Sequence, residues 1–160
     1  MKAYLMIALS IISANLALPQ VQEQDYPPLQ QLISEKQFKK YTNEDSYKKR
    51  MDVYRDVFSS CASELRGRIN EKQIHDIGEI LLKMRAISHY ALNDPTLSSA
   101  SSKDLRSGQV KKLEIRLRKL LGTLKDLELA VPYDYRADFG ATALEIDKLR
   151  DQLLKQLFGL

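Results

Sequence analysis

The chain has 160 residues, with 25 Lys and Arg against 21 Asp and Glu, one cysteine and no tryptophan. One cysteine excludes an internal disulfide, and a formal net charge of +4 is too small to steer a charged partner by itself. With only 6 Gly and 5 Pro, and with many Leu, Lys, Glu, Gln and Arg, the composition predicts an all-α fold.

The first seventeen residues have the order of a secretory signal peptide. A basic start is followed by an almost unbroken apolar stretch over residues 3–12 and then by small side chains. Ala17 supplies a small residue for cleavage, whereas Asn15 fits the small-x-small pattern poorly. The alternative is an uncleaved anchor, but the apolar stretch is shorter than the ~20 residues that cross a bilayer. The predicted domains are a signal peptide over 1–17, a flexible polar spacer over 18–28 and a helical bundle domain over 29–160.

A short extra helix is predicted over residues 29–41, after two prolines that forbid helix. Thr42, with an acidic side chain three residues later, predicts the start of a longer helix over about 45–66, which Gly67 would end. Apolar residues recur in this helix every three or four positions, at Tyr47, Met51, Tyr54, Phe58, Cys61 and Leu65.

Three further helices are predicted downstream. Asn70 and Gln73 form a capping pair for the first of them, which Asn93-Asp94-Pro95 would end. The Ser-rich residues 96–102 are predicted to be a flexible connector. Val131-Pro132 separates the last two helices. The predicted ranges are 70–92, a start within 102–107 to 130, and 134–158.

Two short links in this pattern force antiparallel neighbours, so the helices form two hairpins joined by the Ser-rich connector. No segment has the alternation of a strand. The predicted fold is therefore all-α, an antiparallel up-down four-helix bundle with a short extra N-terminal helix.

The histidines and the cysteine do not have the spacing of a metal or catalytic site. His75 and His89 would stand about 21 Å apart on one helix, too far to share a metal ion. Cys61 lies level with His75 across the predicted hairpin but falls in the buried stripe, where a thiol is inert. A buried structural cysteine is favoured, and an exposed cysteine in an intermolecular disulfide stays open. Met51 is interpreted as a core residue rather than a haem ligand.

The charge pattern of the C-terminal half is the main binding signal. Residues 103–125 carry eight bases and two acids, whereas residues 126–155 carry seven acids and four bases. Pairing between these two neighbouring helices is the simpler explanation. Binding of an anionic surface is the alternative, and its candidate residues are Lys111, Lys112, Arg116, Arg118 and Lys119. No aromatic residues interleave with the basic run, which disfavours nucleic acid.

No phosphate loop, catalytic triad order, zinc-spaced Cys/His set or calcium loop is present, so no enzymatic activity, cofactor or metal is predicted. The sequence predicts an exported, periplasmic or extracellular protein that serves as a non-enzymatic protein-interaction or structural module of the cell envelope. The alternative is a binder of a small ligand or of an anionic envelope surface through residues 103–125. Membrane contact is expected only through an uncleaved leader or weakly through that surface. Self-association would use apolar residues outside the stripes, at Val53, Val57, Leu82, Ile115, Leu121 and Leu129.

Overall fold

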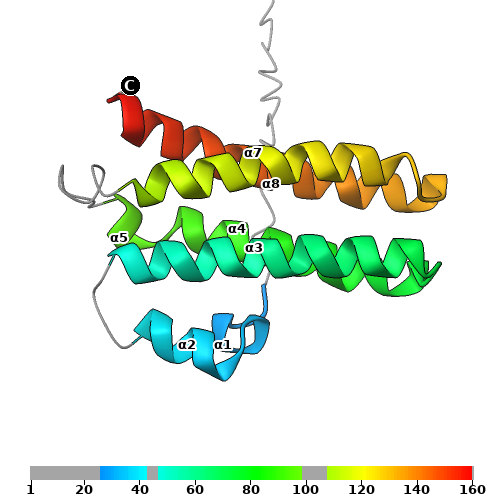
Figure 1. Ribbon diagram of the computed structural model, residues 1–160, viewed down its shortest axis with the longest axis horizontal. Coiled ribbons are helices and arrows are strands. Elements are labelled where there is room, and N and C mark those ends of the chain that lie inside the picture. The colour runs from blue at the N-terminus through cyan, green and yellow to red at the C-terminus, as the bar shows by residue number, and fades with distance from the viewer. Residues whose placement is uncertain (1–25, 43–46, 99–107, 160) are drawn as a thin grey trace, which may run out of the picture.

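The computed structural model describes residues 26–42, 47–98 and 108–159, and every regular element in these ranges is helical (Figure 1). The all-α prediction is confirmed for this part of the chain. The predicted signal peptide and residues 18–25 of the predicted spacer lie outside it. The elements are α1 (Leu29–Leu32), α2 (Glu35–Thr42), α3 (Tyr47–Asn70), the 3₁₀ turn η1 (Ile74–Asp76), α4 (Ile77–Leu92), α5 (Pro95–Ser98), α7 (Gln109–Glu128) and α8 (Tyr133–Phe158).

The four long helices form two antiparallel hairpins, α3 with α4 and α7 with α8 (Figure 1). Tyr54, early in α3, donates a hydrogen bond to Asp94, just after α4. Glu114, early in α7, forms an ion pair with Arg150, late in α8. Both contacts join the start of one helix to the end of its partner, as the short links predict.

The two hairpins stack so that α7 runs along α3 and α8 runs along α4, each in the same direction. Arg66 donates a hydrogen bond to Thr123 at 2.8 Å between the late parts of α3 and α7. Gln156, late in α8, donates to the carbonyl of Leu97 at 2.7 Å, beyond the end of α4. The order of the helices around the core is therefore α3, α4, α8, α7.

The apolar stripes of the four long helices meet in one core. Tyr54, Phe58 and Phe139 are its largest fully buried side chains. Burial of each large apolar side chain contributes about 1.5–3 kcal/mol, so packing can stabilise the fold without a disulfide. The predicted stripe of α3 is buried at every position, at Tyr47, Met51, Tyr54, Phe58, Cys61 and Leu65.

The predicted helix over 29–41 is two helices, because the chain turns at Ile33 and Ser34. The backbone N–H of Gln37 donates to Ser34 Oγ at 3.3 Å, and the N–H of Ser34 donates to Gln37 Oε1 at 2.9 Å. This is a capping box, which starts α2 anew. The α1–α2 segment packs on the outer side of α3 and α4 (Figure 1).

The predicted end of α3 at Gly67 is wrong, because the helix continues for one more turn. Lys72 adopts the left-handed conformation at φ 60°, and the N–H of Gln73 donates to the carbonyl of Arg68 at 2.8 Å. With the bond from the N–H of Lys72 to Ile69 O at 3.1 Å, this is a Schellman ending without glycine. Asn70 therefore ends α3, and the predicted Asn70–Gln73 capping pair does not form.

The predicted flexible connector over 96–102 is wrong in its first part. Residues 95–98 form α5, and Leu97 is fully buried in the core. The expected helix start within 102–107 lies outside the described residues. In the described part α7 begins at Gln109, after Gly108 in the left-handed conformation at φ 74°.

Candidate functional site

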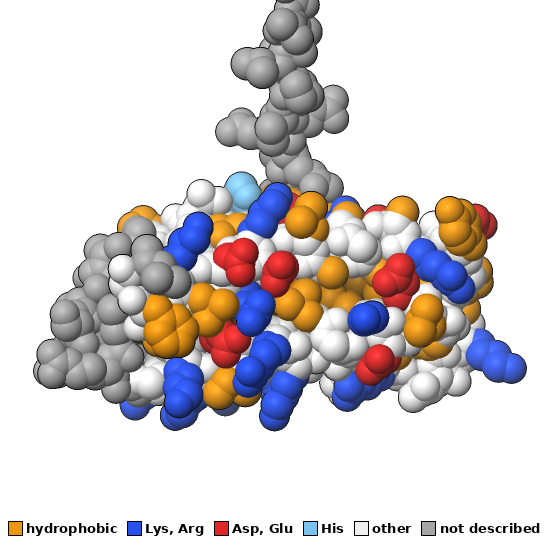
Figure 2. Space-filling model, turned by 90° about the horizontal axis from the view of Figure 1, so that it is seen from above, with side chains coloured by type: hydrophobic (Ala, Val, Ile, Leu, Met, Phe, Trp, Pro, Cys, Tyr) orange, Lys and Arg blue, Asp and Glu red, His pale blue; other side chains and the backbone are white. Residues whose placement is uncertain are grey.

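The five candidate residues for anionic binding all lie on α7, on the side away from its core stripe. Val110, Leu113 and Leu117 are fully buried, so the lysines between them, at 111 and 112, face outward, whereas Glu114 is buried against α8. Four of the candidates are exposed, whereas Arg116 is half-buried. In Figure 2, Lys and Arg side chains gather along the lower edge, with acidic side chains toward the middle of the face. The candidates are Lys111, Lys112, Arg116, Arg118 and Lys119.

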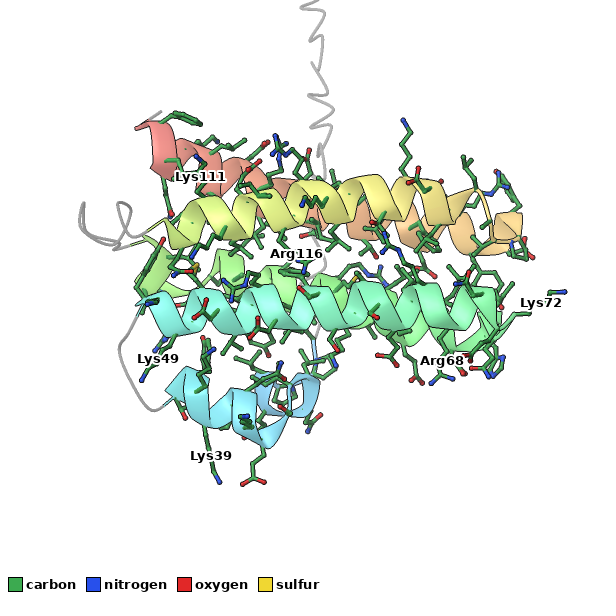
Figure 3. The ribbon with its side chains drawn as sticks, viewed as in Figure 1. Lys39, Lys49, Arg68, Lys72, Lys111 and Arg116 are labelled. Carbon is green, nitrogen blue, oxygen red and sulfur yellow. The ribbon has the colours of Figure 1, made fainter. Side chains whose placement is uncertain are left out.

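Three of these cations line a shallow groove between α7 and α3. The groove has a volume of about 290 Å³ and is lined by Lys112, Ile115, Arg116 and Lys119 of α7 and by Arg55 of α3. Figure 3 places Arg116 between the two helices and Lys111 on the opposite side of α7. We call this surface the α3–α7 groove. Lys111 and Arg118 extend the basic face of α7 but do not line the groove.

The candidate cations of α7 have no carboxylate within 4.0 Å among the described residues. The prediction that α8 neutralises them is therefore wrong in detail. The ion pair between the two helices has the opposite polarity, since Glu114 of α7 accepts from Arg150 of α8 at 3.1 Å. Two acids of α8, Glu145 and Asp147, instead pair with bases on their own helix, at 2.6 and 3.4 Å.

The α3 side of the groove is different, because its cation is already paired. Arg55 Nη1 lies 2.9 Å from Asp52 Oδ1, and Arg55 Nη2 lies 3.5 Å from Asp56 Oδ1. Both acids also lie 3.9 Å from Lys40 of α2, and neither lines the groove. The charge on the α3 edge is therefore compensated, whereas the α7 edge is positive without compensation. The groove is thus positive on one side and nearly neutral on the other.

A buried polar cluster, which sequence reasoning missed, lies between α2, α3 and the turn after α4. Its centre is Asp94, whose side chain has no exposed area. Asp94 Oδ1 accepts from Arg50 Nη1 at 3.0 Å and from the N–H and the hydroxyl of Thr96 at 2.9 and 2.7 Å. Asp94 Oδ2 accepts from the hydroxyls of Tyr54 at 2.7 Å and Tyr41 at 3.2 Å. We call these five residues the Asp94 cluster.

The electrostatics of the Asp94 cluster favour a permanent carboxylate. Burial alone would raise the pKa of Asp94, but hydrogen bonds from Thr96 and Tyr54 and the charge of Arg50 outweigh burial. The pKa of Asp94 is therefore lowered from its ordinary value of 3.8. Burial, together with the negative charge of Asp94, raises the pKa of Tyr54 far above its usual range. The Arg50 guanidinium also lies over the ring of Tyr41, 4.7 Å from its centroid.

The sequence signal for this cluster is an Asp-x-Thr at the end of α4, where Asp94 accepts hydrogen bonds from Thr96 two residues later. That local pattern predicts a turn, and the turn is present. The approach of Arg50 and Tyr54, which lie 44 and 40 residues before Asp94, cannot be inferred from it. The cluster holds three segments together and has no acceptor left for an external group.

Cys61 is buried at 1% exposure, and burial raises the pKa of its thiol to about 11. The prediction of a buried cysteine is confirmed, and its sulfur cannot reach a second chain while the helices stay packed. Met51 is likewise a core residue. His75 lies in η1, exposed, with Nε2 at 2.9 Å from Asp76 Oδ1, and His89 stacks near Tyr26. In the described ranges, no three His, Cys, Asp or Glu side chains come together as metal ligands.

The apolar residues proposed for self-association divide into three groups. Val53 and Val57 are buried, at 1% and 2% exposure, on the helix against which α2 packs, so they are unavailable. Leu82, Ile115 and Leu121 are half-buried, and Leu129 is 72% exposed. Among the described residues, no helix has the length and apolar composition to cross a membrane.

Comparisons with known proteins give no assignment. No protein family, curated protein or solved structure matches the chain. The candidate function therefore depends on the charge, burial and shape of the surfaces described above.

Proposed function

We propose that this chain is an exported, non-enzymatic interaction module of the cell envelope, which binds an anionic partner through the α3–α7 groove. The observation that carries the proposal is the absence of any carboxylate within 4.0 Å of the groove cations Lys112, Arg116 and Lys119 among the described residues. Cations on neighbouring turns of a helix repel each other, and an anion bound between them relieves that repulsion. The signal-peptide pattern of residues 1–17 supports the proposed periplasmic or extracellular location.

The Asp94 cluster supports the non-enzymatic part of the proposal. A catalytic acid or base must reach a substrate within hydrogen-bond distance. Both carboxylate oxygens of Asp94 already accept hydrogen bonds from Arg50, Tyr54, Tyr41 and Thr96, and the side chain is enclosed. The most perturbed carboxylate of the described residues is therefore best explained by stabilisation of the fold.

We propose the architecture of a four-helix bundle whose direction alternates along the chain, with α1–α2 as the short N-terminal addition. Its neighbours are antiparallel within each hairpin, whereas α3 and α7, and α4 and α8, pack in parallel, which differs from the fully antiparallel bundle expected from the sequence. Alternation of direction along the chain supports this architecture, as do the short links within each hairpin. A rigid bundle holds the α3–α7 groove in a fixed shape, which reduces the entropy cost of binding.

A second candidate is direct binding to an anionic envelope surface, such as lipid headgroups. It is favoured by Lys111 and Arg118, which are exposed outside the groove and widen the positive face of α7. A flat charged surface would use these two residues together with Lys112 and Lys119. A partner seated in the groove would not need them.

Charge reversal tests the proposal. Lys112→Glu with Lys119→Glu should abolish retention of the purified protein on immobilised poly-L-glutamate at low ionic strength. The matched control is Lys39→Glu with Lys72→Glu, which changes the net charge equally at sites away from the groove (Figure 3). Equal loss in both pairs would show that net charge alone causes retention, and no loss in either would reject the groove as a binding site.

A further inference from the structure

We infer that the occupant of the α3–α7 groove is an acidic amphipathic helix of a partner protein, which lies along α7 with its carboxylates against the cations. This inference rests on the proposed function and specifies the partner. Three observations carry it, namely the spacing of the cations, the apolar residue between them, and the compensated charge on the α3 side of the groove.

The spacing of the cations is that of a helix face. Lys112, Arg116 and Lys119 lie four and three residues apart, so they recur at about 6 Å and about 4.5 Å along α7. An acidic helix packed beside α7 presents carboxylates at i, i+4 and i+7 with the same repeat. An extended strand presents same-side groups about every 6.6 Å and falls out of register by the third cation. The charge pattern therefore fits a helix better than an extended chain.

The lining of the groove is amphipathic. Ile115 lies between the charged residues in the groove lining and is half-buried, so part of its side chain stays in contact with water. An apolar side chain on the partner helix would cover Ile115 while its flanking carboxylates meet Lys112 and Lys119. An opening of about 290 Å³ lies at the lower limit for enclosed small-molecule sites but suits side chains that pack from an adjacent helix.

The charge on the α3 side of the groove is compensated. Arg55 is paired with Asp52 and Asp56, which also lie 3.9 Å from Lys40 of α2, and neither acid lines the groove. A lipid headgroup layer or a polyphosphate chain carries negative charge everywhere, so it gains no attraction along that nearly neutral edge. A protein helix can carry acids on the side that meets α7 and neutral or basic residues on the side that meets α3. The groove is therefore matched to a partner with a patterned charge.

Two synthetic peptides and two alternative anions test the inference. The first peptide is an 18-residue helix with one Leu stripe flanked on one side by Glu, and the second has the same composition with Leu and Glu intermixed. The alternative anions are polyphosphate and vesicles that contain phosphatidylglycerol. The proteins are the parent chain, the Lys112→Glu/Lys119→Glu pair, Ile115→Ser, and Ile115→Val as the conservative control. Affinity is measured by titration calorimetry, and circular dichroism confirms that each variant is folded.

We expect the striped peptide to bind at least about tenfold more tightly than its intermixed isomer. We expect Ile115→Ser to weaken binding of the striped peptide by about tenfold, and Ile115→Val to change its affinity little. The inference is overturned if both peptides bind equally, or if Ile115→Ser affects neither of them. If polyphosphate or vesicles bind more tightly than either peptide and only charge reversal weakens them, the groove binds anions but not a helix, so the proposed function survives alone. If charge reversal changes no affinity at all, both proposals fail.

Discussion

Arg50 and Arg116 carry the same side chain in opposite situations. Arg50 is 17% exposed and pairs with a fully enclosed carboxylate at 3.0 Å, whereas Arg116 lines an open groove with no carboxylate within 4.0 Å among the described residues. Removing a buried partner leaves an unsolvated charge and is costly to stability. Arg116 is half-buried but has no buried partner to leave unpaired, so removing its charge should cost the fold much less. We therefore expect the Asp94 cluster to matter for stability, and the α3–α7 groove for the proposed binding rather than for the fold.

The largest effect on stability is expected from Asp94→Ala. The substitution leaves Arg50 and Tyr54 without their acceptor and should lower the free energy of unfolding by about 3 kcal/mol, measured by urea denaturation. Asp56→Ala is the matched control, because Asp56 is half exposed and contacts its bases at 3.5 and 3.9 Å. Its cost should stay below about 1 kcal/mol. Similar losses in the two variants would remove the distinction between buried and exposed pairs.

Lowering the pH should reduce the free energy of unfolding by less than Asp94→Ala does. Protonation removes the charge of Asp94 but leaves its side chain in place. The pKa of Asp94 is lowered in the folded state, so its contribution is complete above the ordinary value of 3.8. That contribution is lost as the pH falls below 3.8 and through the lowered folded value. Unfolding of the parent and of Asp94→Asn should therefore be compared between pH 7 and pH 2. The two stabilities should converge at the acid end, and a constant difference would contradict the assignment.

Tyr54→Phe should have a smaller effect than Asp94→Ala, because it removes one of the five hydrogen bonds to the carboxylate and keeps the ring. Loss of a hydrogen bond to a buried charged acceptor costs about 2 kcal/mol. Tyr41→Phe is the graded control, since Tyr41 is half-buried and donates over 3.2 Å rather than 2.7 Å. Thermal unfolding should rank the parent above Tyr41→Phe, with Tyr54→Phe lowest. A reversed order would show that the cluster is held mainly through α2.

The smallest effect on stability is expected from the groove. Lys112→Glu with Lys119→Glu should shift the midpoint of thermal unfolding by no more than about 2 °C, because the parent side chains are exposed and unpaired. The same variant should lose binding to poly-L-glutamate. A large drop in the midpoint would mean that these lysines stabilise the fold. A loss of binding in this variant could then not be told apart from a loss of folded protein.

The sequence predicted the buried faces of the helices better than it predicted their ends. The stripe from Tyr47 to Leu65 was predicted residue by residue, since a 3–4 spacing on a long helix leaves few alternatives. The ends were less well predicted. Gly67 is an interior residue of α3, and Lys72 takes the left-handed position instead, because packing between α3 and α4 sets the place of the turn. The Ser34–Gln37 capping box was visible in the sequence but lay within an apolar pattern that suggested one helix.

The five candidate binding residues stay a prediction, but the expectation for their electrostatic environment was wrong. Charge counts over residues 103–125 and 126–155 suggested mutual neutralisation. Such counts ignore which side of each helix a charge occupies. In the described structure Glu114, the acid among these bases, is the residue that faces α8, and the bases of α7 face the groove and the solvent.

The sequence by itself determined that the described protein is helical and which side of each long helix is buried, because the period of apolar residues fixes both without reference to any partner. Tertiary structure alone decided that α7 lies along α3 and α8 along α4, since the stripes would pack in more than one order. That order places Arg55 opposite Lys112 and Arg116, and the antiparallel pairing of α3 with α4 brings Arg50 and Tyr54 to Asp94. Both arrangements join residues more than 35 positions apart, so only the packing of the helices could produce them.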